Sequence, residues 1–221
     1  MLLKNKTMVG LAALALAGGT AMLAVPAANA ATDRCGDVCV TLASQKFGAT
    51  DVVAVSPSSS GELAAFWYKD SEDFYGQPEG NVSALYRAGV IAKSVDNTYS
   101  SDEVYQYEYA PGGTASGNCL AARPGSTAVT LQPCGATADT LWVGLNGLQH
   151  GNFLPVMSAA LSTKSAMLLT ASTATGALTV SQMALSTTVS NGVTTATDSP
   201  YQMWETVQGA YGSSNVNDDL G

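Results

Sequence analysis

Hydrophobic and polar residues alternate in several short runs along the chain, and each run is flanked by Gly, Pro or Ser. A period of two residues is typical of a β-strand that buries one face. The clearest runs lie at residues 51–56, 104–109, 129–132 and 178–182. Val, Thr, Tyr and Ser are abundant between the turns, so we predict an all-β fold of short strands.

One segment follows helical spacing instead. Leu85, Tyr86, Val90 and Ile91 fall at roughly helical intervals within residues 82–95, although Gly89 weakens the helix. We predict a helical interruption at this place, inside a longer insertion of about residues 70–102.

The chain also contains an internal repeat. A constant offset of 49 residues places Cys119 on Leu168 and Cys134 on Met183, with matching residues in between. In the second copy, a packed Leu/Met pair can occupy the position that a disulfide occupies in the first copy. Each of the two copies then continues to a tryptophan, Trp142 in the first and Trp204 in the second.

A fainter third copy begins near Val40 and ends at Trp67, so each of the three tryptophans closes one copy. Similar strand blocks that cannot bury their apolar faces alone are expected to share a central core. We therefore predict three pseudo-repeats, with Trp67, Trp142 and Trp204 in the structural core and the insertion between the first and second repeats.

The first thirty residues have the pattern of a signal peptide. Lys4 and Lys6 precede a run of Leu, Ala, Val and Gly, and Ala28 and Ala30 fit a signal peptidase site. A retained membrane anchor is the alternative, but glycines and Pro26 interrupt the apolar run. We expect cleavage after Ala30, a secreted extracellular protein and a single domain over residues 31–221.

The charge of the chain argues against two classes of partner. Nine basic and seventeen acidic residues give a net charge of −8, and both lysines of the leader would be lost on export. A negative field repels phosphate backbones and anionic lipid headgroups. We expect no nucleic-acid partner, no membrane surface as a partner, and a monomer.

Four cysteines follow the leader, and four cysteines allow three connectivities. Cys119 and Cys134 flank one hairpin-sized segment, which favours their pairing and leaves Cys35 with Cys39. The alternative makes Cys35 and Cys39 metal ligands, yet the chain has a single histidine and no second cluster of ligands. We expect two disulfides, no metal and no cofactor.

Residues 118–122 (NCLAA), residues 129–134 (VTLQPC) and the pair Leu141-Trp142 together resemble one repeat of the ricin B-type β-trefoil lectins. Gln202-Met203-Trp204 matches the Gln-x-Trp signature of that family, and secreted actinobacterial proteins show a similar pattern. The resemblance implies a β-trefoil of three lobes with four strands each and a buried tryptophan in each signature.

The resemblance also implies where sugar would bind. In the family an Asp after the Cys-Leu pair accepts hydrogen bonds from the sugar, and an aromatic ring stacks on it. The Asp position is Ala121 in the second lobe, Thr170 in the third and about Ala43 in the first. Only the third lobe keeps the Gln, beside a tyrosine, so Tyr201 and Gln202 are the candidate ligand-binding residues.

Alternatives remain for each of these aromatic and polar residues. For Gln202 the favoured alternative is a core residue that stabilises a turn. Tyr105, Tyr107 and Tyr109 share one strand face, which would be a second carbohydrate candidate if it were exposed. The aromatic residues around Phe66 and Phe74 fit either a stacking platform or packing of the insertion.

Catalytic motifs are missing from the sequence. His150 is the single candidate base for a nucleophilic serine, and it lies in turn sequence. No motif singles out a pair among the acids at positions 72, 73, 102, 103 and 108. We expect a non-enzymatic carbohydrate-binding, lectin-like protein. The alternative is an extracellular protein-interaction protein, such as a protease inhibitor or surface component, on the same scaffold without sugar binding.

Overall fold

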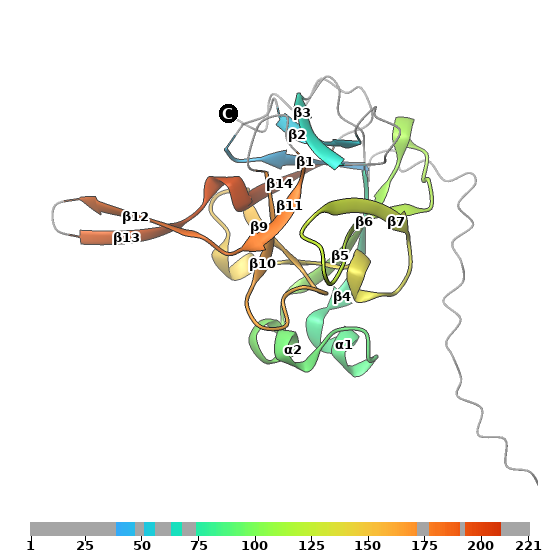
Figure 1. Cartoon of the computed structure of the whole chain (residues 1–221), viewed down its shortest axis with the longest axis horizontal. Helices are drawn as coiled ribbons and strands as arrows, with labels where there is room; N and C mark the ends of the chain where they lie inside the picture. Colours follow the sequence, from blue (N-terminus) through green and yellow to red (C-terminus); the bar gives the residue numbers. More distant parts are fainter. Residues whose placement is uncertain are drawn as a thin grey trace, which may run out of the picture.

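The structure is a computed structural model that describes residues 39–46, 51–55, 63–67, 74–171, 177–190 and 193–208. Six strands pair in a closed ring and form a barrel (Figure 1). In ring order they are β1 (Cys39–Ser44), β4 (Phe74–Asn81), β5 (Glu103–Tyr109), β8 (Trp142–Gly144), β9 (Leu154–Ser158) and β14 (Met203–Gln208). Every neighbouring pair is antiparallel. The predicted all-β fold class is confirmed.

Three hairpins leave the barrel, one after each of β1, β5 and β9. They are β2 (Asp51–Val55) with β3 (Leu63–Trp67), β6 (Asn118–Ala122) with β7 (Val129–Pro133), and β10 (Met167–Thr170) with β11 (Thr179–Gln182). The second and third hairpins are joined by two backbone hydrogen bonds, from the Val129 N–H to the Leu178 carbonyl and from the Val180 N–H to the Thr127 carbonyl. All four predicted alternating runs lie in strands of the structure, namely β2, β5, β7 and β11.

The repeat offset of 49 holds along both strands of the second and third hairpins. Cys119 pairs with Gln132 as Leu168 pairs with Ser181, and the following pairs continue in step. Because register decides which face of a strand is buried, the shared register gives equivalent side chains the same environment. The alignment of these two repeats is therefore confirmed in three dimensions.

The first hairpin has the same register, but it does not follow the alignment that we predicted for it. Val52 pairs with the barrel residue Ala43, as Cys119 pairs with Glu108 and Leu168 with Met157. The counterpart of Ala121 and Thr170 is thus Ala54 rather than Ala43. Our prediction was wrong because the spacing between strands differs in this repeat.

Trp67 also differs from Trp142 and Trp204 in position. It ends β3 and pairs with Asp51 in a hairpin, whereas the other two tryptophans lie in barrel strands. The residue that matches them is Phe74 at the start of β4, which pairs with Val40 and Tyr109 in the equivalent register. The side chain of Trp67 lies outside the described residues, so its place in the core stays a prediction.

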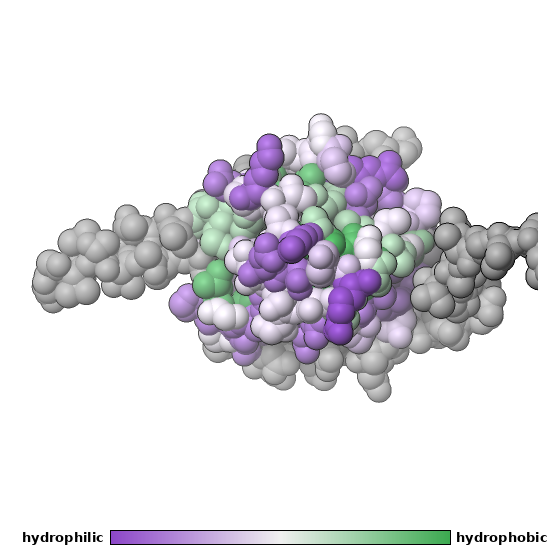
Figure 2. All heavy atoms as spheres, turned by 90° about the horizontal axis from the view of Figure 1, so that it is seen from below, coloured by the Kyte–Doolittle hydropathy of each residue, from purple (hydrophilic) through white to green (hydrophobic). Residues whose placement is uncertain are grey.

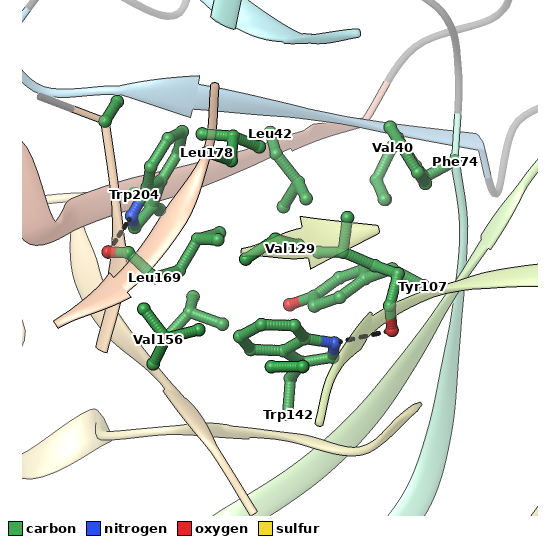
Figure 3. Packing of buried hydrophobic residues seen from close by; sticks show 14 residues of the cluster. Val40, Leu42, Phe74, Tyr107, Val129, Trp142, Val156, Leu169, Leu178 and Trp204 are labelled. Atoms are coloured by element: carbon green, nitrogen blue, oxygen red, sulfur yellow. Dashed lines mark hydrogen bonds between the residues drawn. The ribbon is translucent and has the colours of Figure 1, made fainter. Parts of the chain in front are cut away.

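The barrel interior is filled by one hydrophobic cluster, in which Phe74, Trp142 and Trp204 are fully buried (Figure 3). Both indole N–H groups donate hydrogen bonds of 2.9 Å to backbone carbonyls, Trp142 to Leu120 and Trp204 to Leu169. The acceptors lie in the hairpin strands β6 and β10. Each tryptophan therefore ties its barrel strand to the hairpin of its own repeat.

The helical segment consists of two short helices, α1 (Val82–Arg87) and α2 (Lys93–Tyr99), rather than the single helix that we predicted. Gly89 separates them with a φ of 77°, a left-handed conformation that ends a helix. A second hydrophobic cluster joins Val82, Ile91 and Val95 of this segment to the outer face of β5, β8 and β9. The predicted insertion of about residues 70–102 includes β4, so only the part after Asn81 is inserted into the barrel plan.

Two further features complete the architecture. The hairpin β12 (Leu185–Ser190) with β13 (Val193–Asp198) forms a separate two-stranded sheet that projects from the barrel (Figure 1). Within the described residues four 3₁₀ turns lie in loops, η4 (Pro111–Gly113), η5 (Ala138–Thr140), η6 (Asn146–Leu148) and η7 (Pro200–Gln202). In the part of the chain that the structure describes, no helix is long and apolar enough to cross a membrane. Figure 2 shows hydrophobic areas that are small and separated by hydrophilic ones.

Candidate ligand-binding site

Tyr201 lies on the η7 turn, immediately before the last barrel strand. Its side chain is 36 % exposed, which makes it one of two large hydrophobic side chains on the described surface. The ammonium group of Lys46 lies 5.2 Å from the centre of its ring. This distance is within the range of a cation–π contact. The predicted site residue is thus a ring at the surface with a hydrogen-bond donor beside it.

Gln202 follows Tyr201, but its side chain points into the protein and is 2 % exposed. Its Oε1 accepts a hydrogen bond from the Ala184 N–H at 2.8 Å. Its Nε2 donates to the Ser181 hydroxyl at 2.8 Å, to the Gln182 carbonyl at 2.9 Å and to the Thr170 hydroxyl at 3.2 Å. These bonds fit the alternative role of a turn-stabilising residue. A direct contact of Gln202 with ligand stays a prediction, and it would require the amide to leave these bonds.

Backbone hydrogen bonds attach the same turn to two other segments. The N–H groups of Gln45 and Lys46, just after β1, donate to the carbonyls of Met203 and Pro200. The N–H of Ala171, just after β10, donates to the carbonyl of Tyr201 at 3.1 Å. Because these two segments fix the turn, the ring of Tyr201 is held on a rigid base.

The second repeat replaces Gln202 with two residues, a feature that sequence reasoning missed. Thr140 stands at the Gln position, and its hydroxyl donates to the Gly135 carbonyl at 2.8 Å. The amide of Gln106, from β5, donates to that hydroxyl at 2.8 Å and to the same carbonyl at 2.9 Å. No local signal pointed to Gln106, because it reaches the turn from a strand that precedes it by more than thirty residues.

The positions where the lectin resemblance would place an Asp are buried in the second and third repeats. Ala121 is 0 % exposed and Thr170 is 9 % exposed. The hydroxyl of Thr170 contacts the Leu168 carbonyl and the Ser181 hydroxyl, at 2.9 and 2.8 Å. At Ala54, the counterpart in β2, the side chain lies outside the described residues. Neither of the two buried positions presents an acceptor to solvent.

The tyrosines of β5 face the barrel interior, so they do not form the exposed face that we considered. Tyr107 is 3 % exposed, and Tyr105 and Tyr109 are half-buried against the core. The rings of Tyr105 and Tyr107 are stacked with centres 6.2 Å apart. Burial, followed by the hydrogen bond to Glu103 and the charge of its carboxylate, raises the pKa of Tyr105 to about 12. Burial is also the main cause that raises the pKa of Tyr107.

The predicted disulfide between Cys119 and Cys134 is confirmed, with Cα atoms 4.9 Å apart. In the third repeat Leu168 is fully buried and Met183 packs against the same cluster, as the repeat predicted. Cys39 is buried and disulfide-bonded. Its expected partner, Cys35, lies outside the described residues.

Of the acidic residues that were considered for catalysis, those at positions 72 and 73 lie outside the described residues, and the others have structural contacts. Glu108 is 4 % exposed and accepts hydrogen bonds from the Gly117 N–H at 2.7 Å and from the Gln77 amide at 2.9 Å. Glu103 accepts a hydrogen bond from the Tyr105 hydroxyl. His150 lies in an exposed turn, where its backbone pairs with Phe153. Among the described residues, no three His, Cys, Asp or Glu side chains are grouped to hold a metal ion.

The chain was compared with family models, with curated proteins and with solved structures, and it matches none of them.

Proposed function

We propose that this chain is a secreted, non-enzymatic carbohydrate-binding protein on a β-trefoil scaffold of the ricin B type. Six barrel strands and three hairpins in equivalent register support the trefoil. The signal-like leader and the Cys119–Cys134 disulfide support export, because disulfides persist in oxidising compartments. The acidic net charge of −8 supports a neutral partner rather than nucleic acid or an anionic membrane.

The observation that carries the proposal is the exposed ring of Tyr201 on its fixed turn. A tyrosine ring that is held in place offers an apolar face on which a pyranose stacks with little loss of conformational entropy. A sugar on this ring brings its hydroxyl groups within reach of the Lys46 ammonium group. Gln202 acts as the positioning residue that keeps the turn in place.

The buried Ala121 and Thr170 restrict how the protein binds sugar. Without a carboxylate, each of these lobes lacks charge-assisted hydrogen bonds worth about 1.5 to 3 kcal/mol. Of the positions that the lectin resemblance implies, the Tyr201 surface is therefore the one that binds sugar in this proposal, and its affinity for a single ring is low. A ligand with repeated sugar units is favoured because a polysaccharide offers many copies of the bound ring.

The test is binding of the purified chain to an array of glycans and cell-wall polysaccharides. We expect selective binding that Tyr201→Ala reduces at least tenfold and that Lys46→Ala weakens by a smaller factor. Tyr86→Ala, on α1, is the matched control and should bind as the native chain does. If no glycan is bound, or if Tyr201→Ala binds like the control, the proposal fails.

The alternative function is recognition of an extracellular protein on the same scaffold. It is favoured by one observation, the burial of both positions at which the sugar-binding carboxylate would stand. Under this proposal the chain captures a protein partner, such as a protease, from culture medium while binding no glycan. The array and the capture experiment together separate the two functions.

A further inference from the structure

A cavity of about 250 Å³ opens at one end of the barrel, away from the Tyr201 turn. It is lined by Val40, Gly76, Tyr105, Tyr107, Asn146, Leu154, Val156, Trp204 and Thr206. Three of these residues, Val40, Tyr105 and Leu154, occupy equivalent positions in β1, β5 and β9. Each lies three residues before the residue through which its strand pairs with a hairpin. The cavity therefore lies inside the barrel at the end opposite the hairpins, and we call it the barrel-mouth cavity.

Small residues in one layer of the barrel create this space. Gly76, Gly144 and Thr206 each lie two residues after the aromatic residue of their strand. A Cβ atom on Gly76 would approach Val40 Cγ2 to 3.3 Å, and one on Gly144 would approach Leu154 Cδ1 to 3.0 Å. Two glycines thus replace the side chains that would close the barrel at this level.

One polar side chain of the barrel-mouth cavity can pair with a bound molecule. The side chain of Tyr107 is 3 % exposed, and within the described chain its hydroxyl makes no hydrogen bond. This oxygen is not one of the fully buried, unpaired atoms of the described chain, so it reaches the open cavity and can pair there with water or with a bound molecule. The adjacent Tyr105 hydroxyl donates to Glu103, which leaves its oxygen able to accept a further hydrogen bond.

The lining determines the chemical class of ligand. The stacked rings of Tyr105 and Tyr107 provide aromatic surface, while hydroxyl groups and the Asn146 amide provide donors and acceptors. A molecule with an apolar face and several hydroxyl groups satisfies both kinds of contact. The volume is below the range of about 300–1,000 Å³ that is typical of sites for drug-sized ligands, so the cavity suits a single ring.

Electrostatics further restrict the ligand to an uncharged one. None of the described lining residues is Lys, Arg or His. The nearest charges are acidic: Glu103 binds the Tyr105 hydroxyl, and Asp102 accepts a hydrogen bond from the backbone of Asn146. An acidic sugar would meet these carboxylates without a cation to compensate.

We propose that the barrel-mouth cavity binds one uncharged pyranose ring, such as the terminal residue of a glycan. The ring contacts Tyr105 and Tyr107, and its hydroxyl groups pair with the Tyr107 hydroxyl and the Asn146 amide. The inference rests on the proposed function for its ligand class, but its site shares no described residue with the Tyr201 turn. The chain therefore has two sugar contacts, one on the surface and one at the barrel end.

The test is a titration of the purified chain with glucose, galactose, mannose and N-acetylglucosamine, followed by NMR of backbone and side-chain amides. We expect at least one of these sugars to shift the signals of Gly76, Asn146 and Thr206. Tyr107→Phe should weaken this binding about 2- to 12-fold, the range for one neutral hydrogen bond. Thr206→Trp, an exposed position at the mouth, should abolish it, and galacturonic acid should not bind.

Tyr99→Phe is the matched control because it removes a tyrosine hydroxyl from α2, outside the cavity lining. Shifts confined to Lys46, Tyr201 and Gln202 would overturn the cavity proposal and leave the proposed function standing. Shifts at neither place would overturn the cavity proposal, while the glycan array tests the proposed function separately. Binding that Tyr107→Phe and Thr206→Trp leave unchanged, or equal binding of galacturonic acid, would also overturn the cavity proposal.

Discussion

The indole nitrogen of Trp142 donates a 2.9 Å hydrogen bond to the carbonyl oxygen of Leu120, and both groups are buried. Trp204 and Leu169 repeat this relationship at the same distance. The side chain of Phe74, the equivalent residue of the first repeat, has no N–H group to donate. Two of the three hairpins are therefore fixed to the barrel by an indole hydrogen bond from the barrel strand, and Phe74 cannot make the equivalent bond to the first.

Trp204→Phe should destabilise the chain because it removes this donor from a buried carbonyl and leaves unfilled volume. We expect the free energy of unfolding to fall by about 1–3 kcal/mol from the lost hydrogen bond, with a further loss from the cavity. Urea unfolding followed by circular dichroism measures the change, with Tyr86→Phe as the control. An unchanged urea midpoint would contradict this account.

Gln202→Ala should destabilise the third repeat. The substitution leaves the Ala184 N–H without its acceptor, at about 1–3 kcal/mol for a buried unpaired group, and removes the donor to the Ser181 hydroxyl, which keeps its bond with Thr170. Gln149→Ala is the matched control because that side chain is exposed and bonds only the nearby Gly151 carbonyl. Thermal unfolding compares the two variants, and equal midpoints would mean that the Gln202 network does not hold the turn.

Removal of the Cys119–Cys134 disulfide tests the equivalence of the repeats. The bond closes a loop with a sequence separation of 15, for which the chain-entropy model gives about 3 kcal/mol. Cys119→Ala with Cys134→Ala should lose about this amount. Cys119→Leu with Cys134→Met, which copies the third repeat, should recover part of it through packing. If the Leu/Met variant is no more stable than the Ala/Ala variant in urea, packing does not replace the disulfide here.

The buried tyrosines predict a loss of stability in alkaline solution. The pKa of Tyr105 is raised from 10.0 to about 12, first by burial and then by Glu103. The folded chain therefore holds this proton more tightly than the unfolded chain. The resulting stability is complete below pH 10 and is lost as the pH rises towards 12. Tyr107 acts in the same direction.

Urea midpoints measured between pH 9 and pH 12 test this dependence. Tyr105→Phe keeps the ring and removes the titrating group, so its midpoint should fall less steeply with pH than that of the native chain. Tyr86→Phe serves again as the control. The same slope for Tyr105→Phe and for the native chain would show that Tyr105 makes no contribution.

Some features followed from the sequence because their physical causes are local. A period of two residues predicted four strands, β2, β5, β7 and β11, because successive side chains of a strand face opposite sides. The second and third hairpins were aligned, and their disulfide and Leu/Met pair were matched, because equivalent strand positions carry similar side chains. The helical segment was also located, although Gly89 divides it.

Other features depend on contacts between distant segments, which no local pattern contains. The alternating pattern around an aromatic residue is the same whether its strand lies in a hairpin or in the barrel. Only the pairing of Phe74 with β1 and β5 distinguished it from Trp67 as the match for the two buried tryptophans. In the same way, only the folded chain brings Gln106 to the turn at Thr140.

The sequence by itself thus determined the fold class, the repeat of the last two hairpins and one disulfide, because each is encoded by residue types at fixed spacings. The tertiary structure decided which side chains face solvent. It directed Gln202 and the tyrosines of β5 inward and left Tyr201 at the surface. It also placed Gly76 and Gly144 in one layer of the barrel, where the absence of side chains creates the barrel-mouth cavity. Closure of the barrel through non-local pairing fixes these orientations, and short-range patterns carry no information about that closure.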